Sequence, residues 1–271
     1  MVARKGTRSP RMHPNMEHLE GRQSVLAALK ARQRRFEVIL VSHGAHVEKL
    51  QEVLDLAGQL GVPVRHADAR ELDAMAHGVT HGGILAVCSA KPRATGEQLL
   101  ELVDALREPP LLLLLEGIED ARNLGFTLRS AEAMGAHAVL IKKHLWDLDS
   151  VEIARPAGGA YERLPLAQIE SVEPLIQLQQ RGLRLYGCIA GAKRTLYEAD
   201  LKIGSILAIG GEKRGLSGAV RSICDAFLSI PTRGQGTSLS LSHAASVVMA
   251  EAMRQRWGTD LRSDRGDTPR L

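Results

Sequence analysis

The sequence contains few cysteines, few aromatic residues and no long hydrophobic run. Its three cysteines, Cys88, Cys188 and Cys224, lie far apart within apolar segments and show no C-x-x-C spacing. Such thiols behave as small hydrophobic side chains, so neither disulfides nor structural zinc are expected. No run approaches the roughly 18 apolar residues of a membrane helix, and residues 1–15 lack the apolar middle of a secretory signal. We therefore expect a soluble, cytoplasmic protein with no membrane partner.

Aromatic residues make up 3% of the chain, too few for the base-stacking platforms of proteins that bind single-stranded nucleic acid. The hydrophobic share is 44%, which is enough to bury a real core. At 271 residues the chain is long enough for one large domain or two ordinary ones. These totals predict a globular protein, and any RNA binding would depend mainly on shape and phosphate contacts.

The net charge of +4 is modest, but positive charge is concentrated near the N-terminus. In the first 35 residues Glu17 and Glu20 face a much larger set of cations, namely Arg4, Lys5, Arg8, Arg11, Arg22, Lys30, Arg32, Arg34 and Arg35. Such a stretch suits contacts with RNA phosphates. A solvated basic tail explains the composition equally well, and we expect residues 1–16 to form a flexible basic tail.

Hydrophobic periodicity predicts a small α/β domain over residues 17–90. We expect helices at 21–30, 46–60 and 69–76, and strands at 36–42, 62–65 and 83–88. This alternation favours a partly parallel sheet covered by helices. His77 and His81 would share a helix face only if the helix continued, and Gly78, Gly82 and Gly83 argue against that. No metal site is therefore expected.

A linker is expected at residues 91–110, where prolines flank a charged helix at 95–106. Residues 111–257 then repeat the strand–helix alternation and predict a second α/β domain with a parallel sheet. Its strands are expected at 111–115, 138–142, 184–190, 205–209 and 226–230, with a strand or turn near 164–166. Its helices are expected at about 123–134, 149–154, 173–181, from 217, and 242–257, followed by a flexible tail at 258–271.

Three stretches of this second domain carry more polar and glycine residues than packing requires: residues 120–129, 210–217 and 230–243. In the first, Asn123 occupies a helix-cap position, and Arg129 lies on a narrow polar face where a solvated pair with Glu132 is the simpler interpretation. In the second, an apolar strand ends in a glycine-rich turn, where a parallel sheet commonly binds a ligand. The spacing is neither G-x-G-x-x-G nor a P-loop, which excludes those phosphate-binding modes.

Taken together, the three stretches resemble the motifs of a known family. Asn-Leu-Gly-x-x-x-Arg-Ser-Ala begins at 123, Gly-x-Glu-x-x-Gly-Leu-Ser begins at 210, and Ile-Pro-x-x-Gly at 230 is followed by Ser-Leu-x-x-Ser at 238. They are similar to motifs 1 to 3 of the SpoU (TrmH-like) RNA ribose 2'-O-methyltransferases of the SPOUT superfamily. The resemblance covers roughly residues 17–257 and is closest to the 23S rRNA guanosine 2'-O-methyltransferase branch.

This resemblance implies an RNA-binding N-terminal domain of the ribosomal-protein-L30-like kind and a C-terminal domain with a deep trefoil knot. It also implies S-adenosylmethionine as the cofactor and a homodimer whose two sites are completed across the interface. The implied cofactor-binding residues are Gly210, Gly211, Glu212, Gly215, Ile230, Ser238, Leu239 and Ser240. The implied catalytic residues are Asn123, Arg129, Glu212 and Ser238. Because a guanidinium stays protonated, we expect Arg129 to hold a phosphate and stabilise the developing alkoxide rather than accept the proton.

The chain departs from the family pattern at Ser240, where an Asn is usual, at His243, and at Ala121, where a Pro is usual. Serine reaches less far than asparagine and cannot match its paired donor and acceptor. An active rRNA 2'-O-methyltransferase is therefore expected first, with tRNA as the alternative substrate. A catalytically weak RNA-binding relative and an unrelated α/β enzyme with a small-molecule substrate are the other hypotheses.

Overall fold

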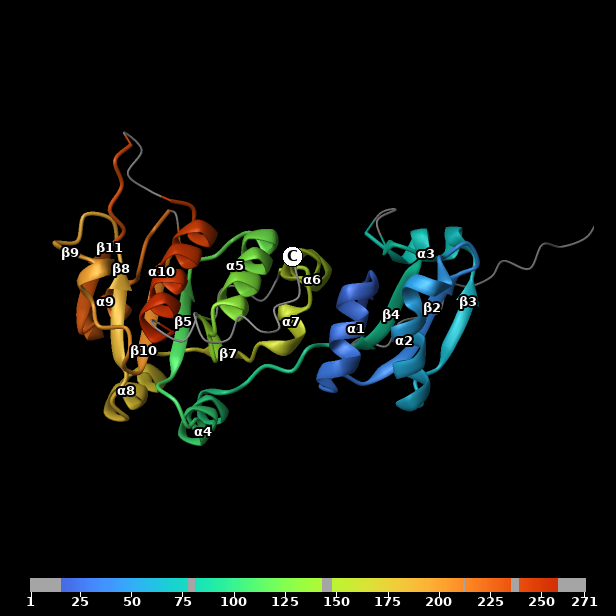
Figure 1. Cartoon of the computed structure of the whole chain (residues 1–271), viewed down its shortest axis with the longest axis horizontal. Helices are drawn as coiled ribbons and strands as arrows, with labels where there is room; N and C mark the ends of the chain where they lie inside the picture. The colour runs from blue at the N-terminus through green and yellow to red at the C-terminus, as the bar shows by residue number, and fades with distance from the viewer. Residues whose placement is uncertain (1–15, 78–80, 143–147, 212, 235–238, 258–271) are drawn as a thin grey trace, which may run out of the picture. The chain divides into compact units, whose positions relative to one another are not determined.

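The computed structural model describes residues 16–77, 81–142, 148–211, 213–234 and 239–257. The expected tails at both ends, Glu212 and Ser238 lie outside these residues, apart from Met16. The chain divides into two compact units, Met1–Pro92 and Arg93–Leu271 (Figure 1). Among the described residues, no helix combines the length and apolar character needed to cross a membrane.

The first unit contains a mixed four-stranded sheet in the order β1-β4-β2-β3. Strands β2 and β3 are parallel, whereas β4 is antiparallel to both β1 and β2. Strand β1 was not predicted, because its sequence follows a basic stretch and alternates only weakly. The elements are β1 (Met16–Glu20), α1 (Arg22–Ala31), β2 (Phe36–Ser42), α2 (Val47–Gln59), β3 (Val64–Ala67), α3 (Ala69–Met75) and β4 (Ile84–Ser89).

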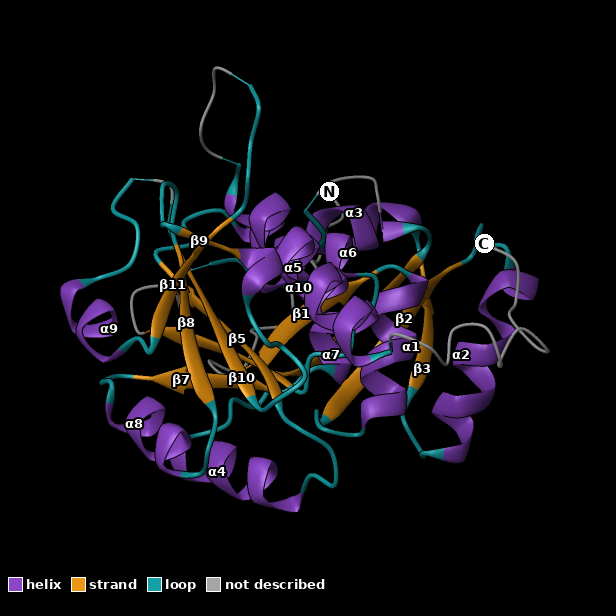
Figure 2. Cartoon of the chain, turned by 60° about the vertical axis from the view of Figure 1, so that its left-hand side comes forward, coloured by secondary structure: helices purple, strands orange, loops and turns teal. Residues whose placement is uncertain are grey.

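The second unit is built on a seven-stranded sheet in the order β7-β6-β5-β10-β8-β11-β9, and every neighbouring pair is parallel (Figure 2). The strands are β5 (Leu111–Glu116), β6 (Ala138–Lys142), β7 (Leu166–Ile169), β8 (Arg184–Cys188), β9 (Arg194–Thr195), β10 (Ser205–Gly210) and β11 (Ala226–Ser229). Strand β5 is buried along its whole length between β6 and β10. The predicted parallel sheet is confirmed, although β9 was not predicted.

Helices cover both faces of this sheet. On one face, Leu99 and Val103 of α4 and Leu175 of α8 share a core with alternate residues of β5, including Leu112 and Leu114. On the other face α5 and α10 pack against each other, and α6 and α7 pack against α5. The helices are α4 (Gly96–Ala105), α5 (Ala121–Ala133), α6 (Ser150–Ala157), α7 (Ala160–Arg163), α8 (Glu173–Gln180), α9 (Gly218–Ile223), α10 (Leu241–Arg256) and the 3₁₀ turn η3 (Leu196–Glu198).

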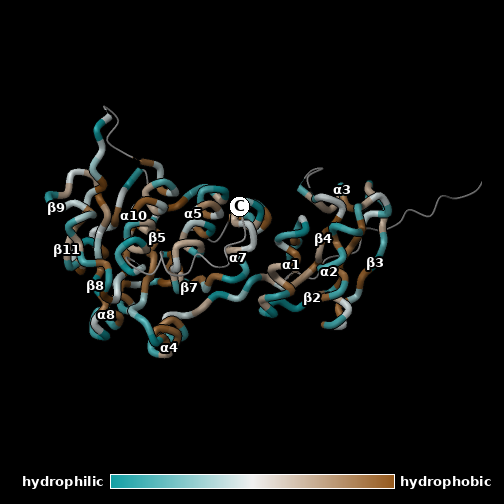
Figure 3. The backbone as a smooth tube through the Cα atoms, viewed as in Figure 1, coloured by the Kyte–Doolittle hydropathy of each residue, from teal (hydrophilic) through white to brown (hydrophobic). Residues whose placement is uncertain are grey.

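Helix α4 lies within the expected linker stretch, yet its apolar residues pack into the second unit. This helix contains both hydrophobic and hydrophilic residues (Figure 3). A capping box fixes its start, since the Thr95 hydroxyl accepts from the Gln98 amide and the Gln98 side chain accepts from the Thr95 amide. Residues 96–105 therefore belong to the core that supports β5, the strand that leads into the first motif.

The start of α5 corrects one expectation. Asp120, and not Asn123, is the N-cap, because its carboxylate accepts a hydrogen bond of 2.7 Å from the Asn123 backbone amide. Asn123 lies in the first turn of the helix, so its side chain does not cap the helix. Both residue types are good caps, and the sequence alone did not distinguish them.

Candidate active site

A cavity of about 280 Å³ opens at the carboxyl edge of the parallel sheet. It is enclosed by the segments that follow β8, β10 and β11 together with the start of α10, which are far apart in the sequence. Five of the predicted cofactor residues line it: Gly210, Gly211, Gly215, Ile230 and Leu239. Open parallel sheets place ligands at this edge.

Two close backbone crossings explain why the wall of this cavity is built from glycine. A Cβ on Gly210 would lie 2.1 Å from the carbonyl carbon of Gly215, and one on Gly211 would lie 2.3 Å from the Gly117 oxygen. Side chains cannot approach backbone atoms so closely, so any other residue would push these segments apart. The glycines of the second motif thus bring the turn after β10 into contact with the loop after β5.

A buried acidic group fastens the same turn. Glu116, the last residue of β5, accepts 2.7 Å hydrogen bonds from the Lys142 ammonium with one carboxylate oxygen and from the Ser217 amide with the other. Lys142 also donates to the Ser217 hydroxyl over 3.2 Å, and Ser217 caps α9. Burial alone would raise the pKa of Glu116, but the hydrogen bonds from Lys142 and Ser217 outweigh it and lower the pKa. Sequence reasoning missed this network, because Glu116 ends an apolar strand with no motif around it.

A second, more polar cavity of about 320 Å³ lies beside the first motif and shares Leu241 with the cavity described above. Gly117, Asp120, Asn123 and Lys213 contribute to its lining. Lys213 forms an exposed ion pair with Glu119. The apolar cavity and this polar one are therefore neighbours that meet at the first turn of α10.

Small hydroxyl side chains join the first and third motifs. The Ser242 hydroxyl lies 3.3 Å from the Asn123 side-chain oxygen, and Ser246 donates to the Ser130 hydroxyl over 2.9 Å. These contacts place α10 beside α5 although more than a hundred residues separate them in the sequence. Ser242 was not predicted as a site residue, although it is the last serine of the Ser-Leu-x-x-Ser motif that begins at 238.

Ser240 lies between two residues that line the apolar cavity, Leu239 and Leu241. It is the N-cap of α10, but its hydroxyl makes no capping hydrogen bond. Instead this hydroxyl lies 2.6 Å from Nδ1 of His243 and 3.3 Å from the Ser242 hydroxyl. Ser240 and His243, the two residues of this segment that depart from the family pattern, therefore contact each other.

Arg129 is exposed on α5, and its guanidinium lies beside Gly158. The expected pair between Arg129 and Glu132 is wrong, because Glu132 forms a two-hydrogen-bond ion pair with Arg163 of α7. Among the described residues, Arg129 lines neither of the two cavities. The structure thus brings Asn123 to the site and leaves Arg129 on the outer face of the same helix.

Gly125 of the first motif has a packing role. A Cβ there would lie 2.4 Å from the Ile153 carbonyl oxygen and 2.5 Å from the ring of Pro156. Helix α6 therefore packs directly on the α5 backbone, and Pro156 sits inside α6 at the point of contact. This contact sets the position of the helix that carries both Asn123 and Arg129.

Two family patterns match the chain. The SpoU rRNA Methylase family matches residues 110–250, and the family described as RNA 2'-O ribose methyltransferase substrate binding matches residues 18–94. The 23S rRNA (guanosine-2'-O-)-methyltransferase RlmB of Pseudomonas putida is 36% identical over 89% of this chain and 97% of its own length. The chain belongs to the SpoU rRNA methylase family.

A further relative and two solved structures are similar to the chain. The RlmB protein of Ralstonia nicotianae is 36% identical over 88% of this chain and 95% of its own. A crystal structure described as an RNA 2'-O ribose methyltransferase superposes with a TM-score of 0.74 at 28% identity, covering 89% of each chain. The SpoU methyltransferase AviRb from Streptomyces viridochromogenes, solved with AdoMet, shares the fold with a TM-score of 0.77 at 23% identity, covering 93% of this chain and 94% of its own.

Two of the residues implied by the SpoU motifs, Glu212 and Ser238, lie outside the described residues. The described part adds apolar wall residues that the motifs did not indicate, including Ile189, Ile209 and Leu228. Cys188 also lines the cavity, and burial raises its thiol pKa to about 12. This cysteine is therefore neutral at physiological pH and contributes an apolar surface.

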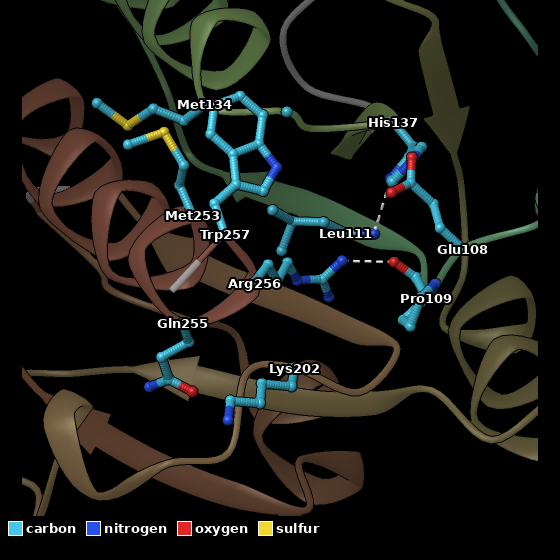
Figure 4. A pocket seen from close by; sticks show the side chains of 11 residues that line it. Glu108, Pro109, Leu111, Met134, His137, Lys202, Met253, Gln255, Arg256 and Trp257 are labelled. Atoms are coloured by element: carbon cyan, nitrogen blue, oxygen red, sulfur yellow. Dashed lines mark hydrogen bonds and ion pairs between the residues drawn. The ribbon is translucent and has the colours of Figure 1, made fainter. Parts of the chain in front are cut away.

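Another cavity of this domain, of about 680 Å³, is lined by none of the motif residues. It lies at the amino end of β5, where Leu111, His137 and Trp257 contribute to its wall (Figure 4). Arg256 of α10 spans this region and donates to the carbonyls of Pro109, Pro110, Leu201 and Ile203. Arg256 and His137 both form hydrogen bonds with backbone groups here, which indicates a structural role for this region.

The two histidines considered as metal ligands have other partners. The His81 ring accepts from the Gly83 amide through Nδ1 and lies 3.0 Å from Asp73 through Nε2. The His77 ring lies 3.2 Å from the buried Glu20. Across the described residues, no group of three or more metal-ligating side chains is assembled.

Proposed function

We propose that this SpoU protein transfers a methyl group from S-adenosylmethionine to a ribose 2'-hydroxyl of 23S rRNA in the cytoplasm. The observation that carries the proposal is the glycine-walled cavity at the carboxyl edge of the sheet, which all three motif segments enter or adjoin. The curated relatives named 23S rRNA (guanosine-2'-O-)-methyltransferase support the substrate, since they align over nearly the whole chain.

The residues present fit this cofactor. Ile189, Ile209 and Leu228 offer apolar surface to a purine ring, and the Gly210–Gly211 backbone leaves room for close hydrogen bonding. When bound, S-adenosylmethionine supplies an electrophilic methyl group on a sulfonium. The neighbouring polar cavity, with Asn123 in its wall, would then receive the ribose. Glu212 and Ser238 remain proposed site residues on the strength of their motifs.

Arg129 would act on the RNA and not as a base. A guanidinium keeps its proton in proteins, so it suits a phosphate next to the reacting ribose and the negative charge that develops on the 2'-oxygen. The hydroxyl proton would leave through that phosphate or a water molecule. Because Arg129 lies on the outer face of α5, away from the cavities of its own chain, we propose that it serves the site of a second copy.

Exposed side chains on two adjacent helices support this homodimer. On α5 the exposed residues Arg122, Phe126, Arg129 and Ala133 recur at helical spacing, and Phe126 is 52% exposed. On α10 the stripe His243, Val247, Ala250, Arg254 and Trp257 is exposed or half-buried at the same spacing, and Trp257 is 50% exposed. Since the two helices pack against each other, the stripes form one face that a second copy would cover.

The knot implied by the family is part of the proposal. It is supported by Ile230, Leu239 and Leu241, which line the cavity together with residues that follow β8 and β10 and precede them in the sequence. Such long-range closure is what a chain end threaded through an earlier loop would produce.

The function is tested by tritium transfer from labelled S-adenosylmethionine to 23S rRNA transcribed in vitro. Mapping of 2'-O-methyl groups on total RNA from cells with and without the gene would then identify one lost nucleotide. Incorporation into tRNA and not into 23S rRNA would contradict the proposed substrate. The absence of cofactor binding by the folded protein in calorimetry would contradict the activity itself.

The shared site is tested by mixing two inactive variants. Arg129→Ala loses the residue proposed to act across the interface, and Gly211→Ala loses the cofactor wall. In a mixed dimer one of the two sites would contain a normal Arg129 and a normal Gly211, so a mixed dimer should have about half of the wild-type activity. Random mixing makes about half of all dimers mixed, so the whole sample should recover about a quarter of the wild-type activity. Mixed dimers that stay inactive would place Arg129 in its own chain's site.

A further inference from the structure

One arginine in the first unit has a backbone conformation that favours glycine. Arg32, the C-cap of α1, has φ 53° and ψ 28°, which is the left-handed region. Among the described residues it is the only residue other than glycine with a positive φ. Glycine is the usual residue in this conformation at the end of a helix, because a Cβ is disfavoured there. A side chain kept at such a position suggests a function.

The turn that follows Arg32 is fixed by hydrogen bonds to the sheet of the first unit. Arg34 points inward with a fully buried side chain and donates to Glu17 over 2.8 Å and to the Ser89 carbonyl over 2.9 Å. The Arg35 amide donates to the Ser89 hydroxyl over 3.0 Å, and the Ser89 amide donates to the Arg35 carbonyl over 2.8 Å. The turn is therefore fastened to the ends of β1 and β4 and cannot relax to relieve Arg32.

The outward-facing groups of this turn are cationic. Arg32 and Arg35 are exposed, and within the described chain neither guanidinium has a hydrogen-bond or ion-pair partner. Lys30, two residues before Arg32, is already paired with Glu52 at 2.6 Å. Attraction to the carboxyl end of α1 accounts for a cation near the helix end, and Lys30 already supplies one in the last turn. It does not account for a second cation in a conformation that a glycine would adopt freely.

We propose that Arg32 and Arg35 form a phosphate-binding site for the RNA substrate, presented by the buried Arg34. The backbone of this fastened turn loses little freedom on binding, and each guanidinium can hold a phosphate with paired hydrogen bonds. The site lies inside the region matched by the substrate-binding family, although that match assigns no role to the turn. The inference rests on the proposed function, since it names one contact of the same RNA.

The decisive variant is Arg32→Gly in the full chain, because glycine removes the charge while suiting the backbone. Affinity for 23S rRNA transcribed in vitro should fall about five- to tenfold, and the slope of log affinity against log salt should become shallower by about one. The thermal midpoint should stay the same or rise, and S-adenosylmethionine affinity should not change. Arg35→Ala should weaken RNA binding similarly, and Arg32→Lys should weaken it less than Arg32→Gly, because an ammonium keeps the charge but cannot form the paired hydrogen bonds.

The matched control is Arg70→Ala, which removes an exposed arginine of α3 in the same unit. It should leave the RNA affinity within about twofold, since long-range charge alone contributes little at physiological salt. Unchanged RNA affinity in Arg32→Gly would overturn the inference while leaving the proposed function intact. An equal loss in Arg70→Ala would also overturn it, because the effect would then be general charge. If the wild-type chain neither bound nor methylated the RNA, the proposed function itself would fail.

Discussion

Replacing Glu116 by glutamine tests whether one buried carboxylate holds the cofactor turn in place. The carboxylate uses both oxygens, one for Lys142 and one for the Ser217 amide. Glutamine keeps the shape but has a single acceptor oxygen, so its NH₂ group would face either the ammonium or the amide, donor against donor. The substitution therefore removes a charge and breaks one of the two hydrogen bonds.

The expected loss follows from the burial of the pair. Removing one partner of a fully buried ion pair costs about 3–5 kcal/mol. The side chains of Glu116 and Lys142 retain 10% and 20% exposure, so water can recover part of this and we expect about 2–3 kcal/mol. Ser217 lies at the end of the turn that follows β10, so a displaced turn should also weaken S-adenosylmethionine binding. A loss of about 1.4 kcal/mol of binding free energy corresponds to an affinity about tenfold lower.

Urea unfolding followed by circular dichroism gives the stability, and calorimetry gives the cofactor affinity. The matched control is Glu119→Gln, which removes an exposed carboxylate paired with Lys213 of the same turn. This control should leave the unfolding midpoint unchanged. The double variant Glu116→Gln, Lys142→Met should recover part of the loss, because no unpaired charge remains. If Glu116→Gln unfolded and bound cofactor like the control, the proposed role of the network would be refuted.

The remaining predictions concern acid stability and three site residues. The pKa of Glu116 is lowered in the folded state, so its contribution to the free energy of unfolding is complete above the unfolded-state pKa near 4.5. This contribution is lost as the pH falls through the lower folded-state pKa. The stabilities of wild type and Glu116→Gln, measured by urea unfolding, should therefore converge as the pH is lowered. Gly211→Ala should abolish S-adenosylmethionine binding in calorimetry, whereas Gly215→Ala, which has open space around its Cβ but a φ of 61°, should only weaken it. Arg129→Ala should lose tritium transfer by at least about a hundredfold and keep cofactor affinity; an active variant would contradict its role. Ser240→Asn should change cofactor affinity by less than about threefold, since the Ser240 hydroxyl contacts His243, and a larger gain would show that Asn is the better residue there.

Periodicity predicted most of the second unit, because its central strands β5, β6 and β10 are largely apolar and a glycine lies at or directly after the C-cap of α5, α6 and α8. The apolar run at 111–115 was expected to be a central strand, and the glycine-rich turn after Ile209 was expected at a ligand-binding edge. The resemblance to the second SpoU motif implied that Gly210, Gly211 and Gly215 bind the cofactor, and they line the cavity. Their physical reason was not predictable, since it depends on backbone crossings with Gly117 and within the turn itself.

Other features depend on contacts between residues far apart in sequence. Strand β1 is a strand because β4 pairs with it, and its own residues carry little β pattern. Glu116, Lys142 and Ser217 come from three separate elements, so no local signal joins them. Arg34 and Arg32 read alike as surface cations, and only the fold shows that one is buried and the other is exposed in a left-handed conformation.

The contacts of Arg256 bear on the order in which the protein is made. This residue, the last of α10, satisfies the carbonyls of Pro109 and Pro110 at the beginning of β5, so the central strand is sealed by the end of the domain. During synthesis the strand emerges from the ribosome about 150 residues before its partner does. A chaperone or the ribosome surface would have to protect the open amino edge of the sheet throughout that interval, and a nascent chain stalled short of residue 256 should remain a target for proteolysis.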